Sequence, residues 1–209
     1  MTQPNKPARP GRPEKYSADT VLQTALNLYW TEGVAALSVN DLVRRMGMPK
    51  PSLYRHFRSE DALQASVLLA YEAGPLARLN EMIRQPGPFS AQLASYLDAL
   101  IDGITGHPQG CLLFQMRESQ ARLGPRAAAT SEAVFSRYVA VVEAWLARAA
   151  AKSEINLQTE ARIAAHLFVG GITLIRNGFR DGLAEADVRS LVRAHMRGIF
   201  TPSDGAAAA

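Results

Sequence analysis

The segment SVNDLVRRMGMPKPSLYRHF, residues 38–57, constrains the fold of this chain more strongly than any other feature. Ser38 followed by Asp41 resembles a capping box that starts a short helix, and Gly47 ends that helix. Pro51 suits the first turn of a second helix because its missing N–H has no hydrogen-bond partner there. The segment therefore predicts two short helices joined by a tight turn, the helix-turn-helix arrangement.

The spacing of apolar residues is helical along nearly the whole chain, and no convincing run of alternating β-branched residues appears. The chain has 209 residues, of which 47% are apolar, so it is long enough to bury a core. We predict an all-α fold of about nine helices, in which a small three-helix N-terminal domain precedes a larger helical domain. The expected divisions are a flexible basic arm over residues 1–16, the helix-turn-helix domain over 17–64, the larger domain over 65–202 and a disordered tail over 203–209.

Capping residues and helix breakers predict the helix boundaries. Ser17 is placed to cap a first helix that stops at Gly33, and Ser59 is placed to cap a fourth helix. Gly74 and Pro75 either end or kink that fourth helix. Further helices are predicted over residues 89–104, 111–123, 158–177 and 184–200, with a long helix of about 25 residues starting at Pro125.

Net positive charge is confined to the N-terminal part of the chain. Residues 1–60 contain nine basic and five acidic side chains, whereas residues 61–209 contain 14 of each. A polyanion would therefore dock on the N-terminal part by neutralising charge and releasing counterions. A solvated basic face without a partner fits the same distribution.

Several classes of protein and site are disfavoured by what the sequence lacks. Cys111 is the only cysteine, which excludes an intramolecular disulfide and a multi-cysteine zinc site and is typical of a reducing, cytoplasmic compartment. No apolar run approaches the roughly 20 residues of a membrane span, and no apolar signal-peptide segment occurs. The four histidines lack metal-ligand spacing, and no hydrolase or nucleotide-binding motif is present. We expect no metal, no cofactor, no membrane partner and no enzymatic activity.

The second short helix carries an outward face of hydrogen-bond donors. Its predicted exposed positions are Lys50, Ser52, Arg55 and His56, and its predicted buried positions are Leu53, Tyr54 and Phe57. Such donors suit phosphates and base edges in the major groove of DNA. A generic helical hairpin with a basic outer face is the alternative interpretation.

The chain from Ala25 to Leu63 closely resembles the DNA-binding domain of the tetracycline-repressor (TetR) family of transcriptional regulators. The matching positions are Ala25, Gly33, Ser38, Asp41, Gly47, residues 53–57 (LYRHF), Ala62 and Leu63. The similarity covers residues 17–64. Beyond it, the lengths and order of the later helices are similar to the ligand-binding and dimerisation domain of that family. The resemblance implies a regulator that binds an operator as a dimer and is released by a small-molecule effector.

The resemblance also assigns roles to residues of the two short helices. It implies that Ser38 caps its helix and touches a phosphate, that Lys50, Pro51 and Ser52 face bases, and that Tyr54 and His56 hold the DNA backbone. From charge and helical phase we add Arg44, Arg45 and Arg55 as candidate DNA contacts. Glu60 departs from the family pattern, in which a lysine that approaches a phosphate usually stands there. Arg58 is the candidate substitute.

The N-terminal arm contains the sequence Arg9-Pro10-Gly11-Arg12-Pro13, which resembles an AT-hook core. In that motif two arginines, here Arg9 and Arg12, flank a small turn and lie in a narrow, electronegative minor groove. The alternative is a basic tail that only raises non-specific affinity for DNA.

Large or polarisable side chains at helical spacing are candidates for the wall of an effector cavity in the larger domain. They are Tyr96, Phe114, Met116, Tyr138, Trp145, Phe168 and Arg176. Each of them also fits ordinary core packing, because aromatic stripes occur in any helical core. The identity of an effector does not follow from these residues.

Cys111 is a candidate sensor of oxidants or electrophiles. It follows Gly110 at the expected first turn of a helix, where the helix dipole favours a thiolate, and His107 is close in sequence. The alternative is a buried, unreactive thiol, which the following Leu112 and Leu113 favour. A Cys111–His107 pair is also the basis of an enzyme hypothesis, although the pair lacks an orienting third group.

The last two predicted helices carry wide apolar faces that predict a homodimer interface. The residues of these faces are Ala161, Ala164, Ala165, Phe168, Ile172 and Ile175 on one helix and Val188, Leu191, Val192, His195 and Ile199 on the next. Pairing with a second copy gives a four-helix interface with twofold symmetry, and hence a palindromic operator. Burial of both faces within one chain is the alternative.

The sequence therefore favours a homodimeric, ligand-responsive, DNA-binding transcriptional regulator, most simply a repressor. Its expected partners are an operator duplex and a small-molecule effector. Two other classes stay open: a helical protein-binding module with an accessory basic head, and a regulator or enzyme that works through Cys111.

Overall fold

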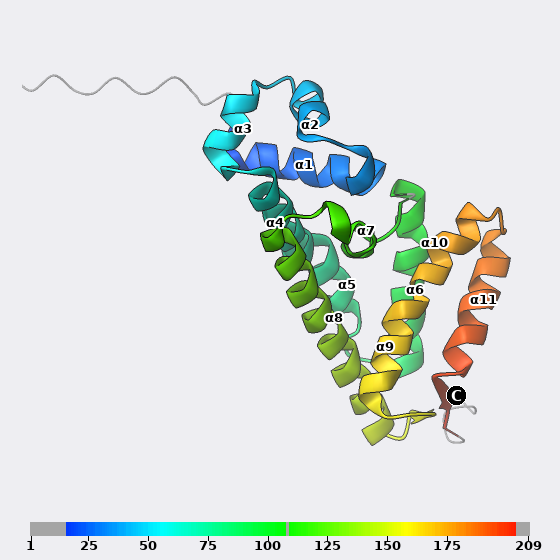
Figure 1. Ribbon diagram of the computed structural model, residues 1–209. Helices are drawn as coiled ribbons and strands as arrows, with labels where there is room; N and C mark the ends of the chain where they lie inside the picture. The colour runs from blue at the N-terminus through cyan, green and yellow to red at the C-terminus, as the bar shows by residue number, and fades with distance from the viewer. Residues whose placement is uncertain (1–15, 108, 204–209) are drawn as a thin grey trace, which may run out of the picture.

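The computed structural model describes residues 16–107 and 109–203, and the described chain is almost entirely helical (Figure 1). The helices are α1 (Ala18–Glu32), α2 (Val39–Met46), α3 (Lys50–Phe57), α4 (Glu60–Tyr71), α5 (Ala77–Met82), α6 (Phe89–Gly106), α7 (Leu112–Glu118), α8 (Pro125–Ala151), α9 (Ala161–Gly171), α10 (Thr173–Arg180) and α11 (Glu185–Arg197). The predicted all-α fold, with a small helical unit before a larger one, is confirmed.

Helices α1, α2 and α3 form a small unit at one end of the molecule, coloured blue to cyan in Figure 1. Ser17 caps α1 by accepting a backbone N–H of its first turn, and Ser38 and Asp41 form a capping box at the start of α2. Gly47 ends α2 in the left-handed conformation, with φ of 61°, and accepts a hydrogen bond from the Tyr16 hydroxyl on its carbonyl oxygen. The boundaries predicted from these caps are confirmed.

Helix α4 runs from the small unit into the larger one and continues into α5 through a π-helical turn, Glu72–Leu76. In this turn the N–H of Ala77 donates to the carbonyl oxygen of Glu72, five residues earlier. Pro75 has no N–H and therefore cannot donate the regular helical bond, which is a common cause of such a local distortion. The break expected at Gly74 and Pro75 is thus a kink within a continuing helix.

Two of the later helices are shorter than predicted. The helix predicted over residues 111–123 ends at Glu118, because a tighter 3₁₀ turn over Gln120–Arg122 follows it. The helix predicted over residues 158–177 is divided at Ile172 into α9 and α10.

A two-stranded antiparallel pairing at the far end of the molecule was not predicted. Strand β1 (Ile155–Leu157) follows α8, and strand β2 (Phe200–Pro202) follows α11, with Leu157 opposite Phe200. Residue 200 was expected to end the last helix. A strand of three residues is too short to show a detectable alternation of apolar and polar side chains. The pairing also joins segments more than 40 residues apart, so no local pattern predicts it.

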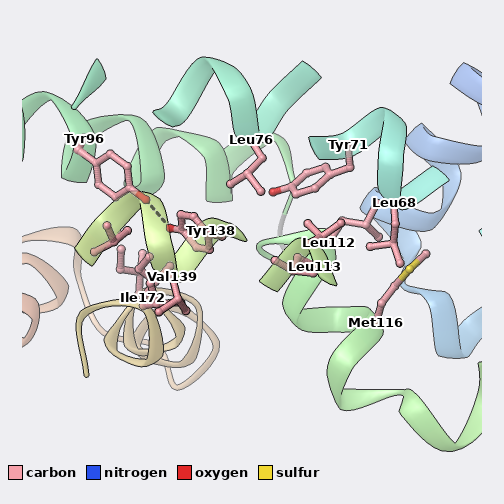
Figure 2. Packing of buried hydrophobic residues seen from close by; sticks show 14 of the residues in the cluster. Leu68, Tyr71, Leu76, Tyr96, Leu112, Leu113, Met116, Tyr138, Val139 and Ile172 are labelled. Atoms are coloured by element: carbon pink, nitrogen blue, oxygen red, sulfur yellow. Dashed lines mark hydrogen bonds between the residues drawn. The ribbon is translucent and has the colours of Figure 1, made fainter. Parts of the chain in front are cut away.

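The core lies around α8, which packs against both α4 and α9. Its largest fully buried side chain is Trp145, whose ring centroid lies 5.9 Å from that of Tyr96 and 5.5 Å from that of Phe168. Figure 2 shows the hydroxyl groups of Tyr96 and Tyr138 joined by a hydrogen bond, so neither buried oxygen lacks a partner. Burying each such large side chain stabilises the fold by roughly 1.5–3 kcal/mol.

Across the described ranges, no helix is long and apolar enough to cross a membrane. Within the same part of the chain, no three His, Cys, Asp or Glu side chains are placed to hold a metal ion.

Candidate functional site

Helix α3 turns one face outward. Lys50, Pro51, Arg55 and Arg58 are exposed, Ser52, Tyr54, His56 and Phe57 are half-buried, and Leu53 is fully buried. Lys50 and Arg55 are exposed as predicted, whereas Ser52 and His56 are more buried than expected, and Tyr54 and Phe57 are less buried than expected. A ligand that reaches this face meets cationic groups and a hydroxyl on one short helix.

Lys50 is held at the start of α3 by contacts with two helices. Its Nζ donates to Asn40 Oδ1 of α2 at 3.1 Å and lies 5.8 Å from the centroid of the Tyr54 ring. Pro49 precedes α3 and offers no side-chain cap to the first N–H groups of the helix. The positive end of the helix dipole and the ammonium group therefore lie together, which favours an approaching anion.

Ser38 and Asp41 are bound to each other at the start of α2. The Ser38 backbone N–H donates to Asp41 Oδ2 at 3.1 Å, its hydroxyl donates to the same oxygen at 2.6 Å, and the Asp41 N–H donates to Ser38 Oγ at 3.2 Å. These bonds, with a further one from Arg44, lower the pKa of the Asp41 carboxyl to about 2. If the exposed Ser38 hydroxyl also contacts a phosphate, it must do so while it forms the hydrogen bonds that cap α2.

Arg44 and Arg45 lie on α2 and each has a carboxylate partner. Arg44 pairs with Asp41 three residues earlier, and Arg45 pairs with Glu32 of α1 at 2.6 Å. The two arginine side chains are 69% and 45% exposed, so these ion pairs are weak in water and open to exchange with a phosphate.

Among the remaining cationic candidates, the structure describes Arg58. Arg58 ends α3 and is exposed, next to the start of α4. Glu60 is half-buried there, and burial raises the pKa of its carboxyl, while the charge of Lys50 opposes that shift. The AT-hook-like arginines Arg9 and Arg12 lie outside the described residues.

A cavity of about 260 Å³ lies beneath the small unit, among α1, the kink between α4 and α5, α6, α7 and α10. Its wall is mostly apolar and aromatic, and includes Trp30, Tyr71, Leu100, Phe114 and Ile175. Such a lining, with a few polar groups, is typical of a pocket for a small organic molecule.

The structure divides the seven residues proposed for an effector cavity into two groups. Phe114 and Arg176 line the cavity beneath the small unit. The other five, Tyr96, Met116, Tyr138, Trp145 and Phe168, are fully or almost fully buried in the core and do not line this cavity. Their packing agrees with the alternative interpretation of an aromatic helical core.

Trp30 of α1 is a cavity residue that the sequence analysis did not single out. Its ring is stacked on that of His107, with centroids 3.5 Å apart and planes within 2°. Its Nε1 donates to the Gly110 carbonyl oxygen at 2.8 Å, and its own carbonyl oxygen accepts from Gln115 Nε2 at 3.2 Å. Its place in the last turn of an amphipathic helix gave no sign of a cavity, because its partners are about 80 residues away in the chain.

A second set of contacts fixes the small unit to the larger one. Asp61 of α4 accepts the backbone N–H groups of Ala127 at 2.7 Å and Arg126 at 3.1 Å, and so caps the start of α8. Arg122 donates to the Ala35 carbonyl oxygen between α1 and α2. The segment between α7 and α8 therefore contacts the connection between α1 and α2 directly, and α4 is bound to the start of α8.

Cys111 lines the cavity and precedes α7 as its N-cap residue. The Tyr71 hydroxyl donates to its Sγ at 3.3 Å. Burial raises the pKa of the thiol, which is opposite to the effect expected from a helix N-terminus. The position of Cys111 in the cavity wall keeps it near any bound molecule, while its raised pKa disfavours the thiolate.

The three helices α1–α3 expose the short cationic helix α3, and α1 and α4 connect this unit to a larger helical part that contains a cavity. This arrangement is typical of helix-turn-helix proteins. Residues 21–67 match the family model described as "Bacterial regulatory proteins, tetR family". This segment of the chain is therefore similar to the N-terminal domain of the TetR family.

Individual relatives agree with this assignment. The HTH-type transcriptional repressor ComR of Escherichia coli (strain K12) is 30% identical over 106 residues, 49% of this chain and 50% of ComR. The chain thus spans about half the length of the curated relatives it matches.

Solved structures share the fold over most of the chain. A TetR-family transcriptional regulator from Agrobacterium tumefaciens superimposes with a TM-score of 0.77 and 22% identity, covering 88% of this chain and 97% of that one. A cysteine mutant of the TetR-family regulator CifR, complexed with 26-base-pair double-strand operator DNA, gives a TM-score of 0.74 and 19% identity, covering 90% and 100%.

Proposed function

We propose that this protein is a DNA-binding transcriptional repressor that binds a palindromic operator as a dimer and is released by a small-molecule effector. The observation that carries the proposal is the outward cationic face of α3 inside the segment that matches the family model. The repressor activity of ComR and the operator DNA bound by CifR support it by likeness.

In this proposal α3 enters the major groove with its first residues toward the bases. Lys50, Pro51 and Ser52 face base edges, and Ser38, Tyr54 and His56 hold the phosphate backbone. Arg44, Arg45 and Arg55 add charge to the same surface, with Arg58 in place of the missing lysine at Glu60. Arg9 and Arg12 extend the contact into the minor groove.

The effector is proposed to act from the cavity beneath α1. Because Trp30 belongs both to α1 and to the cavity wall, a molecule that fills the cavity touches the DNA-binding unit itself. Release from DNA requires only that the effector binds more tightly when α1–α3 are displaced than when they fit the operator.

A homodimer is proposed through α9 and α11, by a face that shares Leu191 with the expected one but differs from it in the other large apolar residues. Most of the apolar residues predicted for the interface are buried within the chain; these are Ala164, Ala165, Phe168, Ile172, Ile175, Val188, Val192 and Ile199. Large apolar side chains that stay exposed on these helices are Ile163, Leu167 and Leu191, at 48%, 43% and 38%. Covering such a face with a second copy is the usual way to remove it from water.

Selection of bound sequences from a random duplex DNA pool at near-physiological salt tests the proposal. The parent protein is compared with an Arg55→Ala plus Tyr54→Phe double variant and with Arg84→Ala, which removes an exposed cation far from α3. A palindromic consensus enriched by the parent and by Arg84→Ala, but lost in the double variant, supports recognition through α3. Affinity for the selected site should also fall steeply as salt rises.

The absence of any consensus from folded, dimeric parent protein would overturn the repressor proposal. The basic head would then be accessory, and the helical body would be a protein-binding module.

A further inference from the structure

The polar groups on the cavity wall are all cationic or neutral. Arg78, His107, Thr173 and Arg176 line the cavity together with apolar side chains, and no Asp or Glu of the described chain does so. A cationic ligand would therefore find no counter-charge there. An anionic or hydrogen-bond-accepting group would find donors on two sides.

Arg176 of α10 is largely buried and already neutralised. Its side chain is 16% exposed and binds Glu118 through two hydrogen bonds, Nη2 to Oε1 at 2.7 Å and Nη1 to Oε2 at 3.0 Å. Its Nε–H, by contrast, is buried and has no acceptor among the described residues. A buried donor without an acceptor is costly, so an acceptor supplied by a ligand would be favoured at this place.

Arg78 of α5 supplies the net charge of the cavity. It is exposed, and no carboxylate of the described chain pairs with it. The π-helical turn places Gly74 beside it, and the guanidinium lies close enough that a Cβ at Gly74 would be 3.8 Å from Arg78 Nη1. Pro75 and Arg78 thus lie on the cavity wall about one and two helical turns after Tyr71.

Part of the cavity wall is aromatic. Trp30, Tyr71 and Phe114 line it, and Trp30 is fixed in place by its stacking on His107 and its bond to Gly110. Aromatic walls of this kind pack well against a flat ring. A volume of about 260 Å³ is enough for a one-ring molecule.

We propose that the effector of this cavity is a small aromatic monocarboxylate, whose ring packs among Trp30, Tyr71 and Phe114 and whose carboxylate binds Arg78 and the Nε–H of Arg176. A single negative charge is favoured because Glu118 already neutralises Arg176, which leaves Arg78 as the one uncompensated cation on the described wall. Carboxylate–arginine bonds are charge-assisted and geometrically matched. This inference rests on the proposed effector function of the cavity.

Three probes of the same shape and different charge test the inference on the full chain: benzoate, benzamide and benzamidine, which are anionic, neutral and cationic. Calorimetric titration should give affinity in that order, with benzoate about tenfold tighter than benzamide. Arg78→Gln should remove the preference for benzoate, and Arg84→Gln, a matched exposed arginine of the same region, should keep it. In Trp145→Phe, Trp30 is the only tryptophan, so benzoate should quench its fluorescence.

The inference is overturned if benzamide or benzamidine binds as tightly as benzoate, if Arg78→Gln keeps the preference, or if none of the three binds. Operator binding of the same preparations is measured in parallel. If the parent protein binds its operator but does not prefer benzoate, only the proposed ligand class is contradicted. If the parent protein does not bind an operator, the proposed function itself is contradicted.

Discussion

The indole ring of Trp30 lies flat against the imidazole ring of His107, with centroids 3.5 Å apart and planes within 2°. Trp30 belongs to α1 of the small unit, and His107 follows α6 at the cavity. Burial lowers the pKa of His107, so the imidazole is neutral at physiological pH and stacks without a desolvated charge. This pair joins the cavity and the small unit by direct contact.

Trp30→Phe should weaken the contact between α1 and the cavity wall while still filling the space of the aromatic ring. The ring still stacks, but the Nε1–H bond to the Gly110 carbonyl oxygen is lost. We expect the free energy of unfolding to fall by about 1 kcal/mol, the net value of one hydrogen bond. Urea denaturation measures this change. An unchanged midpoint would mean that the bond contributes nothing to the junction.

Asp41→Asn should remove a pH-dependent part of the stability. The pKa of Asp41 is lowered from 3.8 to about 2 in the folded protein, so the carboxylate stabilises the fold above pH 3.8 and loses this contribution as the pH falls toward 2. The parent should therefore be more stable than the variant at pH 7, and the difference should shrink below pH 4. Urea denaturation at several pH values measures it. A difference that stays constant with pH would contradict the assigned cause.

Gly110→Ala should destabilise the protein and disturb Arg176. Gly110 has φ of 75°, and an added Cβ would lie 3.1 Å from Arg176 Cδ. We expect a loss of about 1–2 kcal/mol from the left-handed conformation alone. Gly170→Ala is the matched control, because a Cβ there has open space and the residue lies within α9. Thermal unfolding of both variants compares the two sites, and equal effects would refute the argument.

Leu167→Glu should dissociate the proposed dimer. A charge on an exposed apolar residue of α9 would face its symmetry mate or be desolvated in the interface. Leu69→Glu is the control, since Leu69 of α4 is similarly exposed, at 46% against 43%. Sedimentation velocity should show a monomer for the first variant and a dimer for the second. A dimer in both would move the interface away from α9.

Cys111 should react slowly in the folded protein. Burial raises the pKa of its thiol, so few molecules carry the thiolate at pH 7. Alkylation by iodoacetamide should be much slower in native buffer than in urea, with Cys111→Ser as the blank. Alkylation that is as fast in native buffer as in urea, or faster, would support the hypothesis that Cys111 is a sensor.

Local chemistry determined the small α1–α3 unit from sequence alone. Ser17, Ser38, Gly47 and Ser59 act within one helical turn of themselves, so the limits of α1–α4 follow from spacing and capping. The charge of the first 60 residues and the phase of α3 then indicated which face is turned outward. None of these inferences requires a contact between distant parts of the chain.

Only the tertiary structure decided where the cavity lies and which residues form it. Trp30, Arg78 and His107 lie on three separate segments, and no periodicity distinguishes a helical residue that faces a cavity from one that faces the core. For the same reason Trp145 and Phe168 looked as suitable as Phe114. The face of α9 that stays exposed could not be chosen either. A helix with apolar residues on two sides buries one side in its own chain, and long-range packing determines which side that is.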